Sequence, residues 1–220
     1  MPAKANALNI SRHFTESGKD PFDKLSWSKR DVEIRNFDGS VAFSMKDVNL
    51  PDNYSQVAAN VLAQKYLRKA GIPKKLRKVK EKAVPSWLQR SVPDLKSMED
   101  ISEEEKFGEE IDGKQTFRRL AGTWTYWGWK HGYFASEEDA KAYFDEMCYM
   151  LAFQMVSPNS PQWFNTGLNW AYGIEGPAQG HYFVNPKTGD LERSVNAYEH
   201  PQPHACFIQS VSDDLVNEGG

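Results

Sequence analysis

The chain contains 220 residues, of which 40% are hydrophobic and 26% are charged, and its formal net charge is −3. This composition is ordinary for a globular protein and excludes a disordered chain, a collagen-like fibre and a disulfide-rich miniprotein. The longest apolar runs are too short to span a membrane, and the first residues lack the apolar core of a secretory signal. The two cysteines of the chain favour a reducing compartment, so we expect a cytoplasmic protein without membrane contact.

Residues 1–50 are expected to form an N-terminal segment that contains a β-hairpin. Polar and apolar residues alternate over 28–50, on both sides of the dipeptide Asp38-Gly39. Asp-Gly accepts the positive φ angles of a tight turn, so this alternation predicts two antiparallel strands joined at residues 38 and 39.

Residues 51–114 are expected to hold a helix followed by a charged connector. The spacing of apolar residues predicts the helix over 55–70, and Gly71 and Pro73 favour its end there. The buried face of this helix would carry Val57, Val61, Leu62 and Tyr66.

The charges of the connector are divided between its two ends. Nine lysines and arginines lie between residues 65 and 82, and nine acids lie between residues 94 and 112. This division favours a solvated connector whose halves attract each other. The alternative is that the basic half binds polyphosphate, nucleic acid or an acidic partner. Nucleic acid is the weaker partner, because Tyr66 alone could stack on bases there.

Residues 115–220 carry the pattern of a packed core. Phe117, Leu120, Trp124 and Trp127 recur at helical spacing and predict a helix over 115–131 with Gly132 as its cap. A second helix is predicted to begin at Ser136, whose hydroxyl would cap it ahead of three acids, and to run to about Val156. Its buried stripe would carry Ala140, Phe144, Met147 and Leu151.

The part of the chain that follows the second helix is rich in turn residues. The segment SPNSPQWFNTG (157–167) predicts an irregular backbone that can present N–H and C=O groups to a small polar ligand, although an ordinary connection would also fit. A hairpin around 185–190 and an apolar strand over 204–211 are predicted beyond it.

The cysteines and tryptophans leave several readings open. Cys206 lies in the strand sequence PQPHACF, where an inert core residue and a functional thiol both fit. With His204 it makes only half a metal site, so we expect no metal site in this chain. Cys148 is expected to pack inside its helix. Five of the seven tryptophans lie between Trp124 and Trp170, and they favour a core over a base-stacking surface.

Several long stretches of the sequence closely resemble adenosylcobalamin-dependent (class II) ribonucleotide reductases, in the amino-terminal region of that family. The resemblance is weakest over 74–112. The stretches are RRLAGTWTYWGWKHGYF (118–134), SPNSPQWFNTG (157–167), WAYGIEGPAQGHYF (170–183), PQPHACFIQSVSDDLVNEGG (201–220), EIRNFDGSVAFSMKDV (33–48) and LAQKYLRKAGIP (62–73).

The resemblance implies an α+β fold, in which a mostly helical region leads into the first strands of an incomplete ten-stranded α/β reductase barrel. It implies reduction of ribonucleotides, expected as diphosphates, to 2′-deoxyribonucleotides by a thiyl radical. Adenosylcobalamin would be the cofactor, with its site mostly outside this chain. The implied partners are a ribonucleotide, the polypeptide that carries the rest of the barrel, and a thioredoxin-like reductant. Residues 115–220 would then be the helical domain and the first barrel strands.

The resemblance also implies roles for particular residues. Cys206 matches the first thiol of the reducing pair, and Ala205 supplies backbone beside it. Ser160, Pro161 and Gln162 match the segment that holds the nucleotide. The second reducing cysteine and the radical cysteine would lie beyond residue 220, so we expect the chain alone to be inactive. The alternative is a non-catalytic nucleotide-binding or regulatory module derived from such a reductase.

Overall fold

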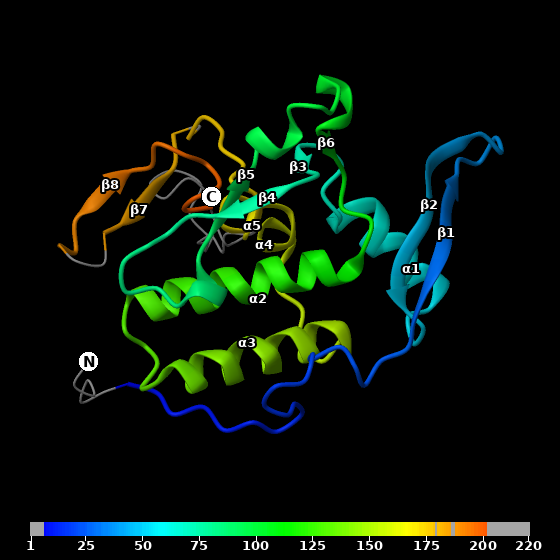
Figure 1. Ribbon diagram of the computed structural model, residues 1–220. Helices are drawn as coiled ribbons and strands as arrows, with labels where there is room; N and C mark the ends of the chain where they lie inside the picture. The colour runs from blue at the N-terminus through cyan, green and yellow to red at the C-terminus, as the bar shows by residue number, and fades with distance from the viewer. Residues whose placement is uncertain (1–6, 179, 186–187, 202–220) are drawn as a thin grey trace, which may run out of the picture.

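The computed structural model describes residues 7–178, 180–185 and 188–201. Two helices, α2 (Gly113–Lys130) and α3 (Glu137–Ala152), run side by side at its centre (Figure 1). The N-terminal segment lies along α3, most of the small sheets lie on the other side of α2, and the N-terminal hairpin lies beside one end of the two helices (Figure 1). No helix of the described residues is long and apolar enough to cross a membrane.

Helix α2 begins at a capping box and carries a buried stripe. The Asp112 side chain accepts from the Lys114 N–H, and the Gln115 side chain accepts from the Asp112 N–H. These bonds satisfy amide groups that the helix itself leaves without partners. Phe117 and Leu120 are buried as predicted, and Gly132 takes a positive φ of 70° just after the helix.

Helix α3 begins where the sequence predicts and ends earlier. Ser136 caps it by accepting from the Asp139 N–H at 3.2 Å. The predicted end at Val156 is wrong, because the helix stops at Ala152 and Gln154 turns the chain with a φ of 58°. Of the predicted stripe, Ala140 and Leu151 are buried, whereas Phe144 and Met147 are partly buried against the core.

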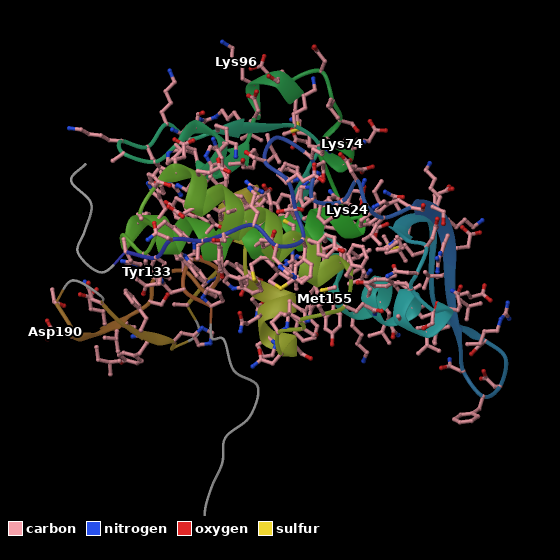
Figure 2. All side chains as sticks on the ribbon, turned by 90° about the horizontal axis from the view of Figure 1, so that it is seen from below. Lys24, Lys74, Lys96, Tyr133, Met155 and Asp190 are labelled. Carbon is pink, nitrogen blue, oxygen red and sulfur yellow. The ribbon has the colours of Figure 1, made fainter. Side chains whose placement is uncertain are left out.

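The predicted N-terminal hairpin is confirmed. Strands β1 (Trp27–Arg35) and β2 (Val41–Pro51) pair antiparallel, and Gly39 takes a φ of 84° in the turn between them. Val32 and Met45 face each other across the pair and enter the core. The tip of the hairpin extends away from the body of the molecule (Figures 1 and 2).

The helix predicted over 55–70 is shorter and differently buried. It consists of α1 (Gln56–Val61) and one turn of π-helix, η1 (Leu62–Tyr66). The predicted burial of Val57 and Val61 is wrong, because they are 72% and 42% exposed. The stripe that enters the core consists of Ala59, Leu62, Ala63 and Leu67. The π-turn, closed by the Leu67 N–H on the Leu62 carbonyl, changes the helical phase that the prediction assumed.

The two halves of the charged connector meet through backbone pairing. Strand β3 (Ile72–Pro73) pairs with β6 (Phe107–Gly108), and β4 (Leu76–Lys78) pairs with β5 (Ser91–Pro93). The basic and acidic ends are therefore side by side, and the attraction between their charges stays a prediction. Short 3-10 turns lie between them, namely η2 (Ser86–Leu88), η3 (Lys96–Met98) and η4 (Glu103–Glu105).

Two short helices and a hairpin complete the described chain. Helices α4 (Ser160–Asn165) and α5 (Leu168–Tyr172) are followed by the antiparallel strands β7 (Tyr182–Val184) and β8 (Leu191–Arg193). This pair confirms the hairpin predicted around 185–190. The predicted strand over 204–211 lies outside the described residues.

The larger of two hydrophobic clusters joins most of the described elements. It takes residues from the hairpin, from α1 and η1, and from the central helices, so it includes all three predicted segments. A smaller cluster of Ile72, Leu168 and Tyr172 joins β3 to α5. The boundaries predicted near residues 50 and 114 stay predictions. The described fold is α+β with small antiparallel sheets, which agrees with the predicted class. The expected barrel is not part of these described elements.

Candidate functional site

The segment 157–167 forms the centre of the candidate site. Residues 157–159 are irregular, but the predicted irregular backbone is wrong for residues 160–165, which form α4. Pro161 lies in the first turn, where its missing N–H breaks no helical bond. Gly167 ends the segment with a φ of 89°, a conformation that favours glycine.

Of the predicted ligand-binding residues, Ser160 faces the π-turn. Its hydroxyl lies 3.3 Å from the hydroxyl of Tyr66, whose ring stacks on Trp163 with ring centres 5.3 Å apart. Trp163 is the one tryptophan of the described chain that is buried, so the predicted tryptophan core is only partly correct. Ser160 and Pro161 are partly buried and do not line the pocket described below.

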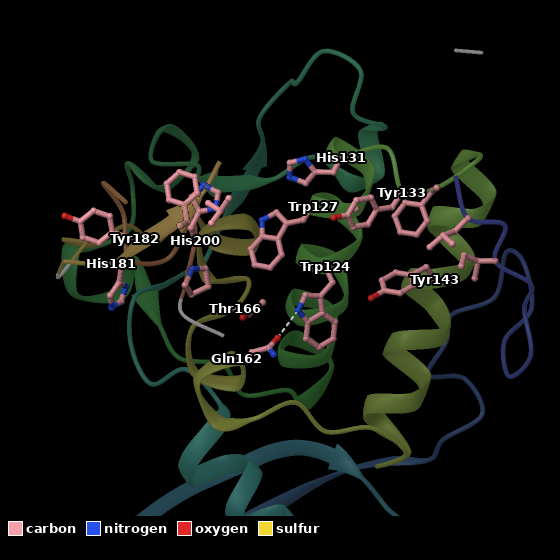
Figure 3. Close-up of a pocket in the computed structure, with 17 residues that line it drawn as sticks. Trp124, Trp127, His131, Tyr133, Tyr143, Gln162, Thr166, His181, Tyr182 and His200 are labelled. Carbon is pink, nitrogen blue, oxygen red and sulfur yellow. Dashed lines mark hydrogen bonds between the residues drawn. The ribbon is translucent and has the colours of Figure 1, made fainter. Parts of the chain in front are cut away.

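Gln162 faces a pocket of about 850 Å³ between α2, α3, the N-terminal segment and β7 (Figure 3). Its Oε1 atom accepts from the indole N–H of Trp124 at 3.2 Å. Thr166, from the end of the same segment, also lines the pocket. Figure 3 shows Trp124 and Trp127 between Tyr182 on one side and Tyr143 on the other.

Among the described residues, the lining of this aromatic pocket contains no Asp, Glu, Lys or Arg side chain. It consists of tryptophan, tyrosine, phenylalanine and histidine rings with aliphatic side chains, Gln162 and Thr166. Pockets of this size, mostly apolar with a few polar groups, are typical of sites for small organic ligands. Its volume and lining suit the flat, uncharged part of such a ligand.

A buried ion pair fixes the backbone of the α4 segment. Arg119 and Glu110 are 1% and 0% exposed, and the Arg119 Nε atom donates to Glu110 Oε1 at 2.8 Å. The Nη1 atom donates to the main-chain carbonyl of Thr166 at 2.7 Å. The Nη2 atom lies within hydrogen-bond distance of the carbonyls of Trp163 at 2.9 Å and Tyr66 at 3.0 Å, and of Glu110 Oε2 at 3.3 Å. One arginine thus holds the C-terminal part of α4 against the end of η1.

The Glu110 carboxylate also accepts hydrogen bonds from three other residues. It accepts from the Arg68 N–H, the Thr116 hydroxyl and the Tyr172 hydroxyl, at 2.8, 2.9 and 2.8 Å. Burial alone would raise the pKa of Glu110, but the charge and hydrogen bonds of Arg119 and these donors hold it below the ordinary value. Burial of Tyr172 beside this carboxylate raises the pKa of its hydroxyl, which stays a donor.

Sequence reasoning did not identify this pair. Glu110 lies in the acidic run between residues 94 and 112, which the charge pattern predicts to be solvated. The available signal was Arg119, which stands on the same helical face as the buried Thr116 and Thr123. An arginine inside a buried stripe requires a carboxylate and further acceptors.

The structure describes Cys148 but not Cys206. Ala205 and Cys206 lie outside the described residues. Cys148 is fully buried in α3, as expected, and burial raises the pKa of its thiol well above the usual value. It is therefore an inert packing residue rather than a nucleophile. Among the described residues, no group of three or more His, Cys, Asp or Glu side chains could hold a metal ion.

Comparisons with known proteins give the family. The family profile described as class II vitamin B12-dependent ribonucleotide reductase matches residues 28–154. Vitamin B12-dependent ribonucleotide reductases of Agrobacterium fabrum and Bradyrhizobium diazoefficiens are 60% and 59% identical over 213 residues. The Streptomyces clavuligerus protein of that name is 33% identical over 213 residues, which cover 94% of this chain and 15% of that protein.

The matched profile covers more than half of the chain, so the chain belongs to the class II vitamin B12-dependent ribonucleotide reductase family. The alignments with the Agrobacterium and Bradyrhizobium proteins cover 97% of this chain. The same alignments cover 17% of each relative, so the chain spans about a sixth of the length of these curated relatives.

Proposed function

We propose that this chain supplies part of the nucleotide site of a reductase that converts ribonucleotides, as diphosphates, to 2′-deoxyribonucleotides. The observation that supports it is the placement of the α4 segment. Gln162 and Thr166 line an aromatic pocket large enough for a nucleoside, while Arg119 fixes the backbone of the same segment. A rigid backbone beside a flat pocket is what positioning a ribose requires.

The proposed chemistry places Cys206 as one thiol of a reducing pair. In the net reaction two thiols become a disulfide and supply two electrons and two hydrogens. The ribose 2′-hydroxyl leaves as water, and a hydrogen takes its place on carbon. A thioredoxin-like dithiol then reduces the disulfide. The second thiol comes from the remaining reductase polypeptide, which we propose as the partner of this chain.

Adenosylcobalamin is the proposed cofactor of the whole enzyme, and the described residues do not fit it. A pocket of about 850 Å³ corresponds to a drug-sized ligand, whereas cobalamin combines a corrin ring, a nucleotide tail and an adenosyl group. The pocket therefore suits a nucleoside and is too small for the cofactor. We place the cobalamin site in the remaining polypeptide.

The first experiment combines this chain with the remaining reductase polypeptide and follows formation of a deoxynucleotide. The chain alone is expected to be inactive, and the mixture should reduce a ribonucleotide in the presence of cobalamin. Cys206→Ser should abolish multiple turnover with the cellular reductant. Cys148→Ala is the matched control and should keep turnover. Normal turnover by Cys206→Ser, or product from the chain alone, would contradict the proposal.

The second experiment tests the α4 segment by substrate affinity. Ser160→Ala should weaken binding by about tenfold at most, because backbone contacts survive the change. Pro161→Gly should weaken it further, since it loosens the first turn of α4. Ser102→Ala, in a distant 3-10 turn, is the control. If neither change in α4 alters affinity, the segment is only a connection.

A further inference from the structure

The N-terminal segment supplies part of the wall of the aromatic pocket. We refer to its residues 8–15 as the strap. Leu8 and Ile10 of the strap line the pocket. Rings from α3 and from the loop between α2 and α3 line it as well, and Figure 3 shows two of them, Tyr133 and Tyr143, on the same side of the pocket. The extent of the pocket on that side therefore depends on where the strap lies.

The first part of the strap is held by backbone hydrogen bonds. The Leu8 N–H donates to the Tyr133 carbonyl at 2.7 Å, and the Leu8 carbonyl accepts from the Ala135 N–H at 3.0 Å. Two residues further on, the Ile10 N–H donates to Asp139 Oδ1 at 2.7 Å. These three bonds fix the backbone of the two strap residues that line the pocket.

Glu146 of α3 holds the last part of the strap. Its Oε1 atom accepts from the N–H groups of His13 and Phe14 at 3.0 Å each. It also accepts from the N–H and the hydroxyl of Thr15, at 2.9 and 2.7 Å. Glu146 and Thr15 are each 8% exposed, so these charge-assisted bonds are shielded from water. Four donors at one carboxylate oxygen make Glu146 the main attachment at this end.

The acids that hold the strap share one face of α3. Two adjacent pairs of acids lie seven residues apart, which is about two helical turns, so they face the same way. Between the two ends of the strap, the Arg12 guanidinium donates to one acid of each pair, at 2.6 and 3.1 Å. The pairs are Glu138 with Asp139, and Asp145 with Glu146.

The hydrophobic attachment of the strap is small. None of residues 8–15 belongs to either hydrophobic cluster, and Leu8 is 55% exposed. The strap contacts the rings of α3 through Phe14, which stacks on Tyr149 with ring centres 5.0 Å apart. Segments with few buried apolar contacts open at a lower free energy than the whole fold. The strap can therefore leave α3 while the core stays folded.

We propose that the strap is a movable wall of the aromatic pocket, and that Glu146 is the positioning residue that keeps it closed. When the strap opens, Leu8 and Ile10 leave the wall and the pocket opens further to water. A ligand in the pocket contacts this wall only while the strap is closed, so the strap controls the release of the ligand. The identity of that ligand rests on the proposed function, whereas the opening itself does not.

Native-state hydrogen exchange of the unmodified protein tests whether the strap opens as a unit. The amides of Leu8, Ile10 and residues 13–15, with the amide of Ala135 that bonds the strap, should exchange through one shared opening. The free energy of this opening should be lower than that of the amides in the middle of α2 and α3. If the strap amides exchange only together with those helices, the proposal is wrong.

Glu146→Gln tests the positioning role. Besides the amides of residues 13–15, it should speed exchange at Leu8 and Ile10, which it does not touch, by about tenfold or more. Glu137→Gln, in the first turn of the same helix, is the matched control, because its carboxylate bonds side chains outside the strap. If only residues 13–15 exchange faster in Glu146→Gln, the carboxylate acts locally and the strap is not a unit.

Acrylamide quenching of tryptophan fluorescence tests whether the strap closes the pocket. Acrylamide is small and neutral, and Trp124 and Trp127 line the pocket. Glu146→Gln should increase the quenching, and the increase should be lost when both tryptophans are replaced by phenylalanine. Glu137→Gln should leave the quenching unchanged. Unchanged quenching in Glu146→Gln, or an increase that persists without the two pocket tryptophans, would overturn the proposal.

Discussion

Replacing Arg119 by methionine is the most direct test of what holds the α4 segment. The change keeps an unbranched, flexible side chain, shortened by most of the guanidinium, and removes all its donors. Glu110 then loses its charge partner, and the carbonyls of Tyr66, Trp163 and Thr166 lose theirs. Removing one partner of a buried pair costs about 3–5 kcal/mol. That is a large part of the roughly 5–15 kcal/mol by which domains are stable.

Urea unfolding followed by tryptophan fluorescence measures the effect of Arg119→Met. With an m-value of about 2 kcal/mol per molar urea, the midpoint should fall by about 1.5–2.5 M. Lys141→Met is the matched control, since it breaks an exposed pair with Glu137 across 3.0 Å. That pair is worth about 0.5 kcal/mol at most. A loss below about 1 kcal/mol for Arg119→Met would refute the reasoning.

Glu110→Gln adds a pH test of the same pair. Because the folded pKa of Glu110 lies below the unfolded value, its contribution to stability is complete above the unfolded pKa. It is lost as the pH falls through the lower folded pKa. Glu110→Gln should therefore remove part of the acid sensitivity of unfolding. In the double variant with Arg119→Met, the two losses of stability should be less than additive, because each single change leaves a buried charge without its partner and the second change removes that charge.

Three further predictions concern other parts of the fold. Gly167→Ala should lower the free energy of unfolding, measured with urea, by about 2 kcal/mol or more, because a Cβ there would overlap the Arg119 carbonyl. The control Gly39→Ala has a similar positive φ in open space and should cost about 1 kcal/mol in the same assay. In a Cys206→Ser background the Cys148 thiol should resist a thiol reagent until the protein is unfolded, and rapid labelling of the folded protein would contradict its burial. Glu146→Gln should speed hydrogen exchange of the amides of residues 13–15, which donate to this carboxylate. Burial raises the pKa of Glu146, but hydrogen bonds from these residues hold it below the ordinary value, so protection of the wild-type amides should fail as the pH falls through that pKa. Unchanged exchange in the variant would refute the role of Glu146 in holding residues 13–15.

The elements that sequence reasoning predicted well are those with local signals. The Asp38-Gly39 turn, the Ser136 cap and the apolar spacing of α2 each depend on residues within a few positions of one another. Such signals act through backbone geometry and hydrogen bonds that the segment itself completes. They therefore survive in the folded protein almost unchanged.

The misplaced elements depend on distant contacts. The π-turn at residues 62–66 places Tyr66 against Trp163, a residue almost a hundred positions away, and it leaves Val57 in solvent. The burial of Glu110 needs donors from the backbone just after η1, from α2 and from α5 at once. A local pattern of charges does not indicate which distant donors will meet at one carboxylate. An acidic run is therefore predicted to be solvated.

The same convergence limits what the α4 segment can offer a ligand. Arg119 occupies the carbonyls of Trp163 and Thr166, and the Trp124 indole, which can only donate, occupies Gln162 Oε1. The Gln162 amide group that faces the aromatic pocket is thus left with its N–H donors. A ligand that bonds this amide group must supply acceptors, and ribose hydroxyls and phosphate oxygens are acceptors. The described lining of the pocket contains no Lys or Arg and suits a base, so we expect groups beyond this lining to neutralise the phosphates of the proposed substrate.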